Sequence, residues 1–387
     1  MKDIIKLYAI LILVLPSCIQ KYQGPLFPVK NLENKWGYID TLGNEFIKFQ
    51  YDSACSFSEG YGIVRLGQDF FYIDQFGEKQ FDAKLGKNSP FLISLIPKKI
   101  FIEDYNFHEG LALFYDENVG LYGYKNKRNN IVIKPKFVEA KRFSENLAAV
   151  NSIIDSSKNE HSTIPKCKYG FINTKGEMVI QPQYDEAYNF GEGKAFVNFN
   201  SNDKFNKDGL MRIGWSGYYI NKKGKFVSES LGCVNGYAFQ GGFALMQSIN
   251  LRLMGYNSYF YIDSLFNQLP KIDGKDYFFK DANRFYEGVS SVSSDSKWYL
   301  INEKFDLITQ QEFQEISKCS EGLIKVKYND KYGFIDKTGS FTIKCKFNKC
   351  SDFNNGLAYA ELEDYNVFTW GYINKKGIFV WQLTKSK

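Results

Sequence analysis

Small or apolar residues alternate with polar ones over many short stretches of this chain, and each stretch follows a glycine-containing turn. Ala112 and Phe114 form one such apolar pair, and Ala195 and Val197 form another. Side chains two positions apart point to the same face of a strand, so this period predicts short β-strands with one buried face. The high aromatic content of 17% and the 32 glycines are also typical of β structure that is rich in turns.

A four-residue frame, which reads Phe-Ser-Glu-Gly at Phe57–Gly60, marks the turn before these strands. The frame begins at residues 57, 107, 143, 190, 239, 285, 319 and 353. An aromatic residue stands six positions before each start, except where Cys233 replaces it. This recurrence is far beyond chance and predicts a repeated aromatic core. The expected core residues are Trp36, Tyr51, Phe57, Phe107, Phe143, Tyr184, Phe190, Phe239, Phe285, Phe347, Phe353 and Trp370.

A second landmark precedes each frame and reads Lys-Trp-Gly-Tyr-Ile-Asp-Thr-Leu-Gly at Lys35–Gly43, with clear copies that begin at Lys168 and Lys331. Asp or Asn at the first turn position bonds its own backbone, and Gly at the fourth position takes the left-handed conformation that closes a hairpin. Each unit is therefore predicted to run strand, Asx turn, strand, Glu-Gly turn, strand. The expected turn residues are Asp40, Gly43, Asn173, Gly176, Asn221, Gly224, Asp336, Gly339, Asn374 and Gly377.

Together these two landmarks resemble the WG-repeat family, which consists of bacterial tandem repeats named for their Trp-Gly pair. The resemblance covers residues 34–387, as eight full units and a C-terminal half unit. It implies a repetitive β architecture in exported or surface proteins, and it implies no catalytic residues.

The units are too small to fold alone, because the shortest spacing between frames is 34 residues. Repeats of this size bury their hydrophobic faces by stacking on their neighbours. We therefore expect an all-β tandem array of three-stranded units, arranged as an open hairpin array or a superhelical β-solenoid. The alternative is a β-propeller-like ring, although propeller blades usually contain four strands.

The N-terminus has the features of an export signal. A basic start is followed by an uncharged run over residues 7–15, which is too short to span a bilayer and suits a signal peptide. The following Leu-Pro-Ser-Cys resembles the lipobox of bacterial lipoproteins, in which the cysteine carries lipid. We expect a signal peptide over residues 1–17, lipidation of Cys18, a tether over residues 18–33 and the repeat domain over residues 34–387. Simple secretion is the alternative.

Reactive groups are scarce in the repeats. Asp40 and Asn173 occupy the same turn slot, and Asn cannot act as a general base. Of the six cysteines beyond Cys18, Cys233, Cys319 and Cys350 replace apolar or small residues of other units, and disulfides are the alternative to free thiols. The two histidines, His108 and His161, have no repeated partner. We therefore expect no catalytic residue, no metal site and no cofactor. The net charge of +6 comes from 49 basic and 43 acidic residues that nearly cancel, so nucleic-acid binding is not expected.

The function expected from these features is that of a non-catalytic binding scaffold at the bacterial cell envelope, attached to the membrane by its lipid alone. Its partner would be an envelope or extracellular protein of unknown identity. One alternative is a glycan-binding module whose aromatic side chains stack on sugars. A less favoured alternative is an enzyme that cleaves polysaccharides or esters on a propeller scaffold.

Overall fold

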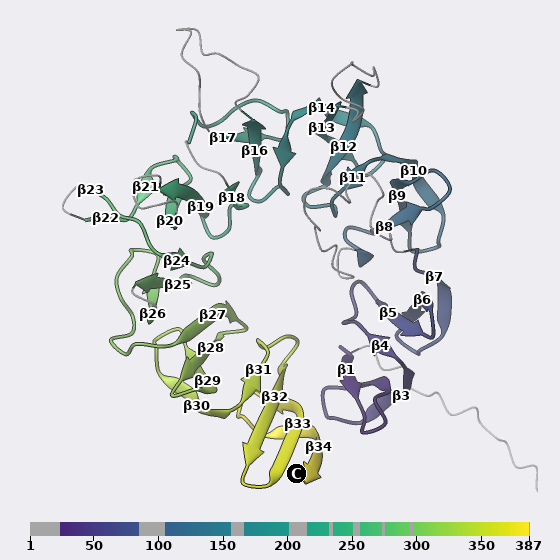
Figure 1. The fold of residues 1–387 in the computed structure, drawn as a ribbon, viewed down its shortest axis with the longest axis vertical. Helices are drawn as coiled ribbons and strands as arrows, with labels where there is room; N and C mark the ends of the chain where they lie inside the picture. The colour runs from purple at the N-terminus through teal and green to yellow at the C-terminus, as the bar shows by residue number, and fades with distance from the viewer. Residues whose placement is uncertain are drawn as a thin grey trace, which may run out of the picture.

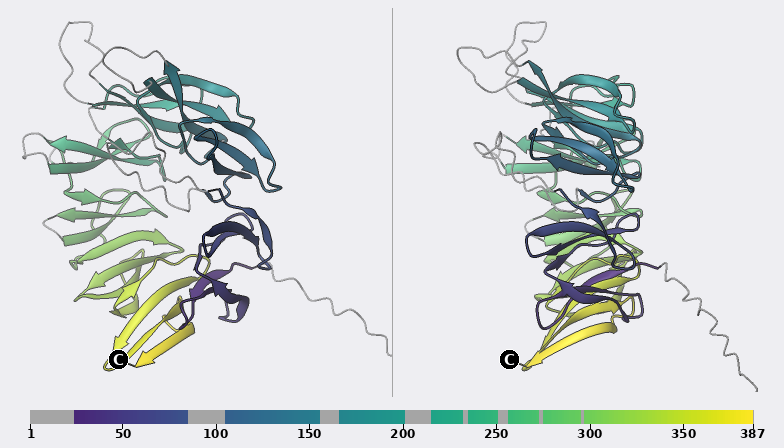
Figure 2. Two further views of the ribbon diagram at one scale, coloured as in Figure 1. Left: turned by 45° about the vertical axis from the view of Figure 1, so that its right-hand side comes forward. Right: turned by 90° about the vertical axis from the view of Figure 1, so that its right-hand side faces the viewer.

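The computed structural model describes residues 24–84, 105–155, 166–200, 215–231, 235–250, 256–272, 275–294 and 297–386. The secondary structure of these residues consists of short strands, turns and a single helical residue at Tyr105. Figure 1 shows small sheets arranged as blades around a ring, and Figure 2 shows the ring from the side. The described residues form ten sheets, of which nine are blades and one is a two-stranded hairpin. The all-β prediction is therefore confirmed, and the structure is a nine-bladed β-propeller.

The first blades illustrate the strand order. Blade 1 contains β1 (Phe27–Lys30), β2 (Trp36–Ile39) and β3 (Glu45–Tyr51). Blade 2 contains β4 (Ser53–Ala54), β5 (Tyr61–Leu66), β6 (Asp69–Asp74) and β7 (Lys79–Asp82). Neighbouring strands are antiparallel, with β4 near the ring centre and β7 at the perimeter (Figure 1).

The remaining blades follow the same order from the centre outward. Blade 3 contains β8 (Leu111–Asp116), β9 (Leu121–Asn126) and β10 (Ile131–Phe137). Blade 4 contains β11 (Glu139–Ala140), β12 (Leu147–Asp155), β13 (Lys166–Asn173) and β14 (Met178–Tyr184). Blade 5 contains β15 (Glu186–Ala187), β16 (Lys194–Asn200) and β17 (Trp215–Asn221). Blade 6 contains β18 (Asn235–Gly236), β19 (Phe243–Asn250), β20 (Tyr256–Asp263) and β21 (Gln268–Leu269).

A two-stranded hairpin, β22 (Lys271–Ile272) and β23 (Lys275–Asp276), separates blades 6 and 7. Blade 7 contains β24 (Asp281–Ala282), β25 (Val289–Ser294) and β26 (Lys297–Asn302). Blade 8 contains β27 (Glu315–Ser320), β28 (Leu323–Tyr328), β29 (Lys331–Asp336) and β30 (Phe341–Phe347). Blade 9 contains β31 (Lys349–Cys350), β32 (Leu357–Asp364), β33 (Val367–Asn374) and β34 (Phe379–Ser386).

An aromatic pair joins each of several blades to the next. In the first such contact, the ring of Tyr38 lies 4.9 Å from that of Phe57, and its hydroxyl donates to the carbonyl of Cys55 at 2.8 Å. Such a pair contributes about 0.5–1.5 kcal/mol beyond the burial of its area. The equivalent pairs are Tyr72 and Phe107, Tyr124 and Phe143, Phe171 and Phe190, Tyr219 and Phe239, Tyr261 and Phe285, and Phe334 and Phe353.

The glycine of the Asx turn makes a second repeated contact, with the outer strand of the preceding blade. Gly77 of blade 2 has a φ of +83°, and a Cβ added there would lie 2.9 Å from Cγ2 of Ile47 in β3. Only glycine therefore fits between the two blades. The same contact joins Gly176 to Ile133, Gly224 to Ile180 and Gly377 to Ile343.

The ring closes where blade 9 meets blade 1, a contact called the seam below. Gly43 of blade 1 lies against Val380 of β34, as Gly77 lies against Ile47. The rings of Phe49 and Trp381 stack across the seam with their centroids 6.2 Å apart. Because the seam reuses the glycine contact of the other blades, the array is closed. The ring alternative is confirmed, and the open array that we favoured is not formed.

The start of the repeat domain and the number of strands in a blade differ from the sequence analysis. Phe27 and Val29, which we assigned to the tether, are buried in β1 of the first blade. This strand follows no Trp-Gly landmark, so the repeat pattern gave no signal for it. Five of the blades also have four strands, because a two- to six-residue inner strand precedes the Glu-Gly turn. A two-residue strand is too short to produce a visible period of two.

Candidate functional site

The predicted turn residues lie in the Asx turns that join the third and outer strands. The Asp40 carboxylate accepts hydrogen bonds from the backbone N–H groups of Leu42 and Asn44, at 2.8 and 2.9 Å. Partial burial acts to raise the pKa of Asp40, but the hydrogen bonds from Asn44 and the neighbouring amides outweigh it and lower that pKa. Asn173, Asn221, Asp336 and Asn374 accept bonds at the same two positions. These side chains hold turns.

The glutamates of the Glu-Gly turns connect neighbouring blades, a role that the sequence analysis did not predict. Glu59 accepts a hydrogen bond from the backbone N–H of Gly110 in the next blade at 3.1 Å, and it pairs with Lys127 at 3.0 Å. Glu287 accepts bonds from the N–H groups of Glu321 and Gly322. Partial burial raises the pKa of Glu59, but its bonds with Lys127 and Gly110 outweigh that effect and lower it.

The predicted core residues lie between the blades, as their spacing suggested. Most are buried, whereas Trp36, Phe57 and Trp370 keep part of their surface exposed. The buried members are Tyr51, Phe107, Phe143, Tyr184, Phe190, Phe239, Phe285, Phe347 and Phe353. Their role is to hold the scaffold together, and a ligand site must therefore lie elsewhere.

A buried lysine lies between blades 2 and 3. Lys125 is only 4% exposed, in a slot where Ile39 and Ile73 stand in the first two blades. Its Nζ lies 4.6 Å from the ring centroid of Tyr72 and 4.5 Å from that of Phe81. Burial lowers its pKa to about 8. The two aromatic faces favour the charged form, so this lysine acts as a cation–π contact between blades.

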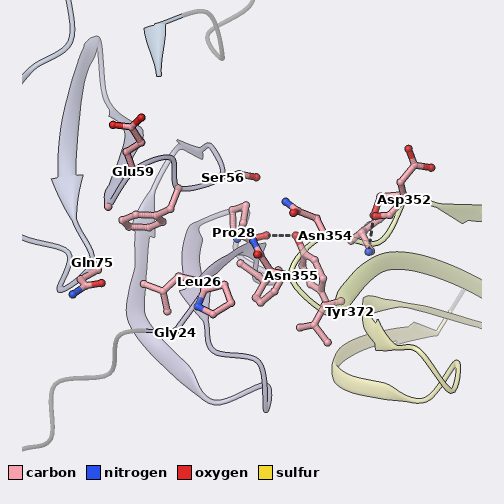
Figure 3. A pocket seen from close by; sticks show the side chains of 17 residues that line it. Gly24, Leu26, Pro28, Ser56, Glu59, Gln75, Asp352, Asn354, Asn355 and Tyr372 are labelled. Carbon is pink, nitrogen blue, oxygen red and sulfur yellow. Dashed lines mark hydrogen bonds between the residues drawn. The ribbon is translucent and has the colours of Figure 1, made fainter. Parts of the chain in front are cut away.

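A pocket of about 530 Å³ opens at the seam, beside the inner edge of β1. Figure 3 shows residues of blade 1 on one side of it, residues of blade 9 on the other, and Glu59 and Gln75 of blade 2 nearby. Tyr372 reaches across the pocket floor, where its hydroxyl donates to the carbonyl of Pro28 at 3.0 Å. The lining mixes apolar rings with backbone and amide groups.

A second surface, called the apolar rim below, lies at the ring perimeter over blades 3, 4 and 5. Its members are the exposed apolar residues Ile131, Val132, Val179, Phe226 and Val227. They lie on three successive blades, since the turn of blade 4 lies against β10 and the turn of blade 5 lies against β14. Adjacent exposed apolar side chains are typical of protein interaction surfaces. The sequence pattern gave no signal for this surface, since its residues occupy ordinary strand positions.

The other chemistry considered in the sequence has no assembled site among the described residues. There, no group of three His, Cys, Asp or Glu side chains could hold a metal ion. Within the same residues, no helix is long and apolar enough to cross a membrane. The five described cysteines, Cys55, Cys167, Cys319, Cys345 and Cys350, form no disulfide with one another. Cys18, His161 and Cys233 lie outside the described residues.

Comparisons with known proteins agree with this architecture. The WG containing repeat matches residues 36–68, 122–152, 169–202, 300–332 and 332–365. A crystal structure of "the eukaryotic initiation factor" is 9% identical, with a TM-score of 0.57, over 94% of this chain and 96% of that one. Apo AztD from Citrobacter koseri is 11% identical, with a TM-score of 0.38, over 93% and 97%. No curated protein sequence matches the chain. The WG containing repeat is thus found at five places in a chain that folds as a propeller.

Proposed function

We propose that this protein is a non-catalytic binding scaffold of the bacterial envelope, which binds another envelope or extracellular protein through the apolar rim. The rim is the single observation that carries this proposal. Ile131, Val179 and Phe226 are 56%, 43% and 45% exposed on three adjacent blades. Burying them against a partner would contribute about 25 cal/mol for each Å² removed from water.

The charges around the rim indicate what kind of partner would fit. Lys134 and Lys136 are exposed on β10, and Lys223 and Lys225 are exposed beside Phe226. An apolar centre with a basic border is complementary to a partner that presents an apolar patch bordered by Asp and Glu. Such charges would speed encounter and select the partner, while the apolar contacts would hold it.

The experiment compares two variants of the full chain in capture from cross-linked envelope extract. The first carries Ile131→Ser, Val179→Ser and Phe226→Ser. The matched control carries Leu307→Ser and Ile378→Ser, which replace apolar residues on blades 7 and 9 that are at least as exposed. We expect the rim variant to lose a protein that the control and the native chain both retain. Retention of the same proteins by all three chains would contradict the proposal.

Two further parts of the proposal depend on the N-terminus and on the aromatic residues. Attachment through Cys18 predicts that Cys18→Ala releases the protein from the membrane and that globomycin blocks its processing. The glycan-binding alternative needs exposed rings in rows, and it has less support. The four tryptophans whose burial is described, Trp36, Trp298, Trp370 and Trp381, are partly buried, and among the tyrosines whose burial is described only Tyr365 is more than half exposed.

A further inference from the structure

The outer strands of most blades are protected against pairing with another chain. β3, β10, β14 and β30 each pair with their neighbour at only three positions, with register shifts between them. Such bulges bend an outer strand and displace its outward N–H and C=O groups. Pro135 in β10 and Pro182 in β14 each remove one further N–H group.

The outer strand of blade 9, β34, lacks this protection over most of its length. Its six residues Trp381–Ser386 pair with β33 at consecutive positions, without a register shift. β34 contains no proline, and Lys385 is its only charged residue. It is the last strand of its sheet and lies at the ring perimeter (Figure 1), so no strand among the described residues pairs with its outer side. A regular edge of this kind can add a strand from another chain.

The hairpin between β32 and β33 determines which backbone groups of β34 face outward. Asp364 and Val367 flank a two-residue loop, and the pair that flanks such a loop exchanges hydrogen bonds. Bonded and non-bonded pairs alternate along the ladder, so Val367 bonds to β32 and Phe368 bonds to Lys385 of β34. The same alternation directs every second residue of β34 away from β33. The outward N–H and C=O groups belong to Gln382, Thr384 and Ser386.

The side chains of β34 give the edge one partly apolar face and one polar face. Trp381 lies on the face toward blade 1, because its ring stacks on that of Phe49. Side chains two positions apart share a face, so Leu383 and Lys385 lie on the same side as Trp381. The opposite face carries Gln382, Thr384 and Ser386, which are exposed. An added strand that fits this edge must present the same two faces.

A second copy of β34 meets this requirement when it runs antiparallel with Leu383 opposite its own counterpart. Thr384 then lies opposite Gln382 of the second copy, and these two outward residues exchange backbone hydrogen bonds. Lys385 lies opposite Trp381 of the second copy, where its ammonium can contact the face of the indole. The two Lys385 residues are four positions apart along the strands, about 14 Å at 3.4 Å per residue. Their repulsion is therefore largely screened at a Debye length of about 8 Å.

We propose that this protein forms a symmetric dimer in which the β34 strands of two copies pair antiparallel, with Leu383 at the two-fold axis. Because β34 lies at the perimeter, the second ring lies outside the first, and the two copies of blade 9 join in one eight-stranded sheet. One strand from each copy forms a small interface, so the dimer dissociates on dilution. The apolar rim lies on other blades, so this proposal is independent of the proposed function.

The first test is sedimentation equilibrium of the full chain over a series of concentrations. Thr384→Pro removes an outward N–H that no bond within blade 9 uses, whereas Thr384→Ala keeps that N–H and changes the side chain alone. We expect a reversible monomer–dimer equilibrium for the native chain, weakened about tenfold or more in Thr384→Pro and changed little in Thr384→Ala. A native chain that stays monomeric at every concentration, or equal dissociation constants for the two variants, would overturn the proposal.

The second test uses disulfide formation and depends on neither proline nor the strength of the dimer. Opposite residues in a non-bonded antiparallel pair have Cα atoms about 4.5 Å apart, which a disulfide can bridge. Copper phenanthroline should therefore oxidise Leu383→Cys to a covalent dimer linked through position 383, as identified by mass spectrometry of its peptides. Thr384→Cys is the matched control, because it faces Gln382 of the second copy. Equal yields from the two variants, or no link through position 383, would contradict the proposed register.

Discussion

Replacing Gly43 with alanine tests the contact that closes the ring. Gly43 has a φ of +88°, and a Cβ there would lie 2.0 Å from the carbonyl oxygen of Val380 and 3.3 Å from the Cβ of Trp381. Gly60 is a matched control, because its φ is +89° and a Cβ there would meet no atom within 4 Å. Both substitutions carry the same backbone strain, about 1–2 kcal/mol. Only Gly43→Ala also disturbs the seam.

The additional cost follows from the geometry of the contact. A carbon atom cannot remain 2.0 Å from a backbone oxygen, so β34 and the turn of blade 1 must move apart. This movement weakens the stacking of Phe49 on Trp381, and overpacking of this kind costs about 1–3 kcal/mol. We therefore expect Gly43→Ala to lower the free energy of unfolding by about 2–5 kcal/mol, and Gly60→Ala by about 1–2 kcal/mol.

Urea unfolding followed by tryptophan fluorescence measures both losses, and Trp381 reports directly on the seam. A larger loss for Gly43→Ala than for Gly60→Ala is the expected result. If the two variants lost the same free energy of unfolding within about 0.5 kcal/mol, the contact at the seam would not contribute to stability and the reasoning would be refuted.

Three further predictions concern contacts between blades. Burial of the Lys125 ammonium costs about 3 kcal/mol, because its pKa falls from the ordinary lysine value of 10.5 to about 8. Its cation–π contacts offset part of this cost. Lys125→Met should therefore stabilise the chain by about 1–3 kcal/mol at pH 7 in urea titrations. Because the unfolded chain binds more protons between pH 8 and 10.5, native stability should rise over that range, and the rise should be absent in Lys125→Met. Because the pKa of Glu59 is lowered in the folded chain, its contribution to the free energy of unfolding is lost as pH falls below about 4.5. The melting temperature of Glu59→Gln should therefore drop less steeply with acid than that of the native chain. An unchanged slope would contradict this. Tyr124→Phe removes the 2.7 Å bond to the carbonyl of Lys141 and should cost about 1–2 kcal/mol in urea unfolding, whereas no loss would show that the bond is replaced.

The turns and the core could be predicted from sequence because they depend on local rules. Asp40 and Gly43 form a turn through bonds within five residues, and that geometry survives the exchange of Asp for Asn. The aromatic residues recur because each must meet a partner in the next blade. Phe57 and Phe107 therefore appear at fixed positions in the frame, whatever the overall shape of the array.

The closure of the ring and the two surfaces could not be predicted in the same way. Closure depends on the angle of rotation between neighbouring blades. Contacts between blades, such as that of Gly77 with Ile47, set this angle, and no single repeat encodes it. The apolar rim consists of residues such as Val179, whose exposure depends on which strand lies at the perimeter. The seam pocket reflects the place of β1 in the ring, and that strand follows no Trp-Gly landmark.

A double-mutant cycle on Phe49 and Trp381 tests the central claim, that blade 9 closes on blade 1, most directly. These residues are far apart in the chain and touch only if the ring is closed. Unfolding free energies of Phe49→Ala, Trp381→Ala and the double variant should give a coupling of about 0.5–1.5 kcal/mol. Losses that add with no coupling would contradict the closed ring.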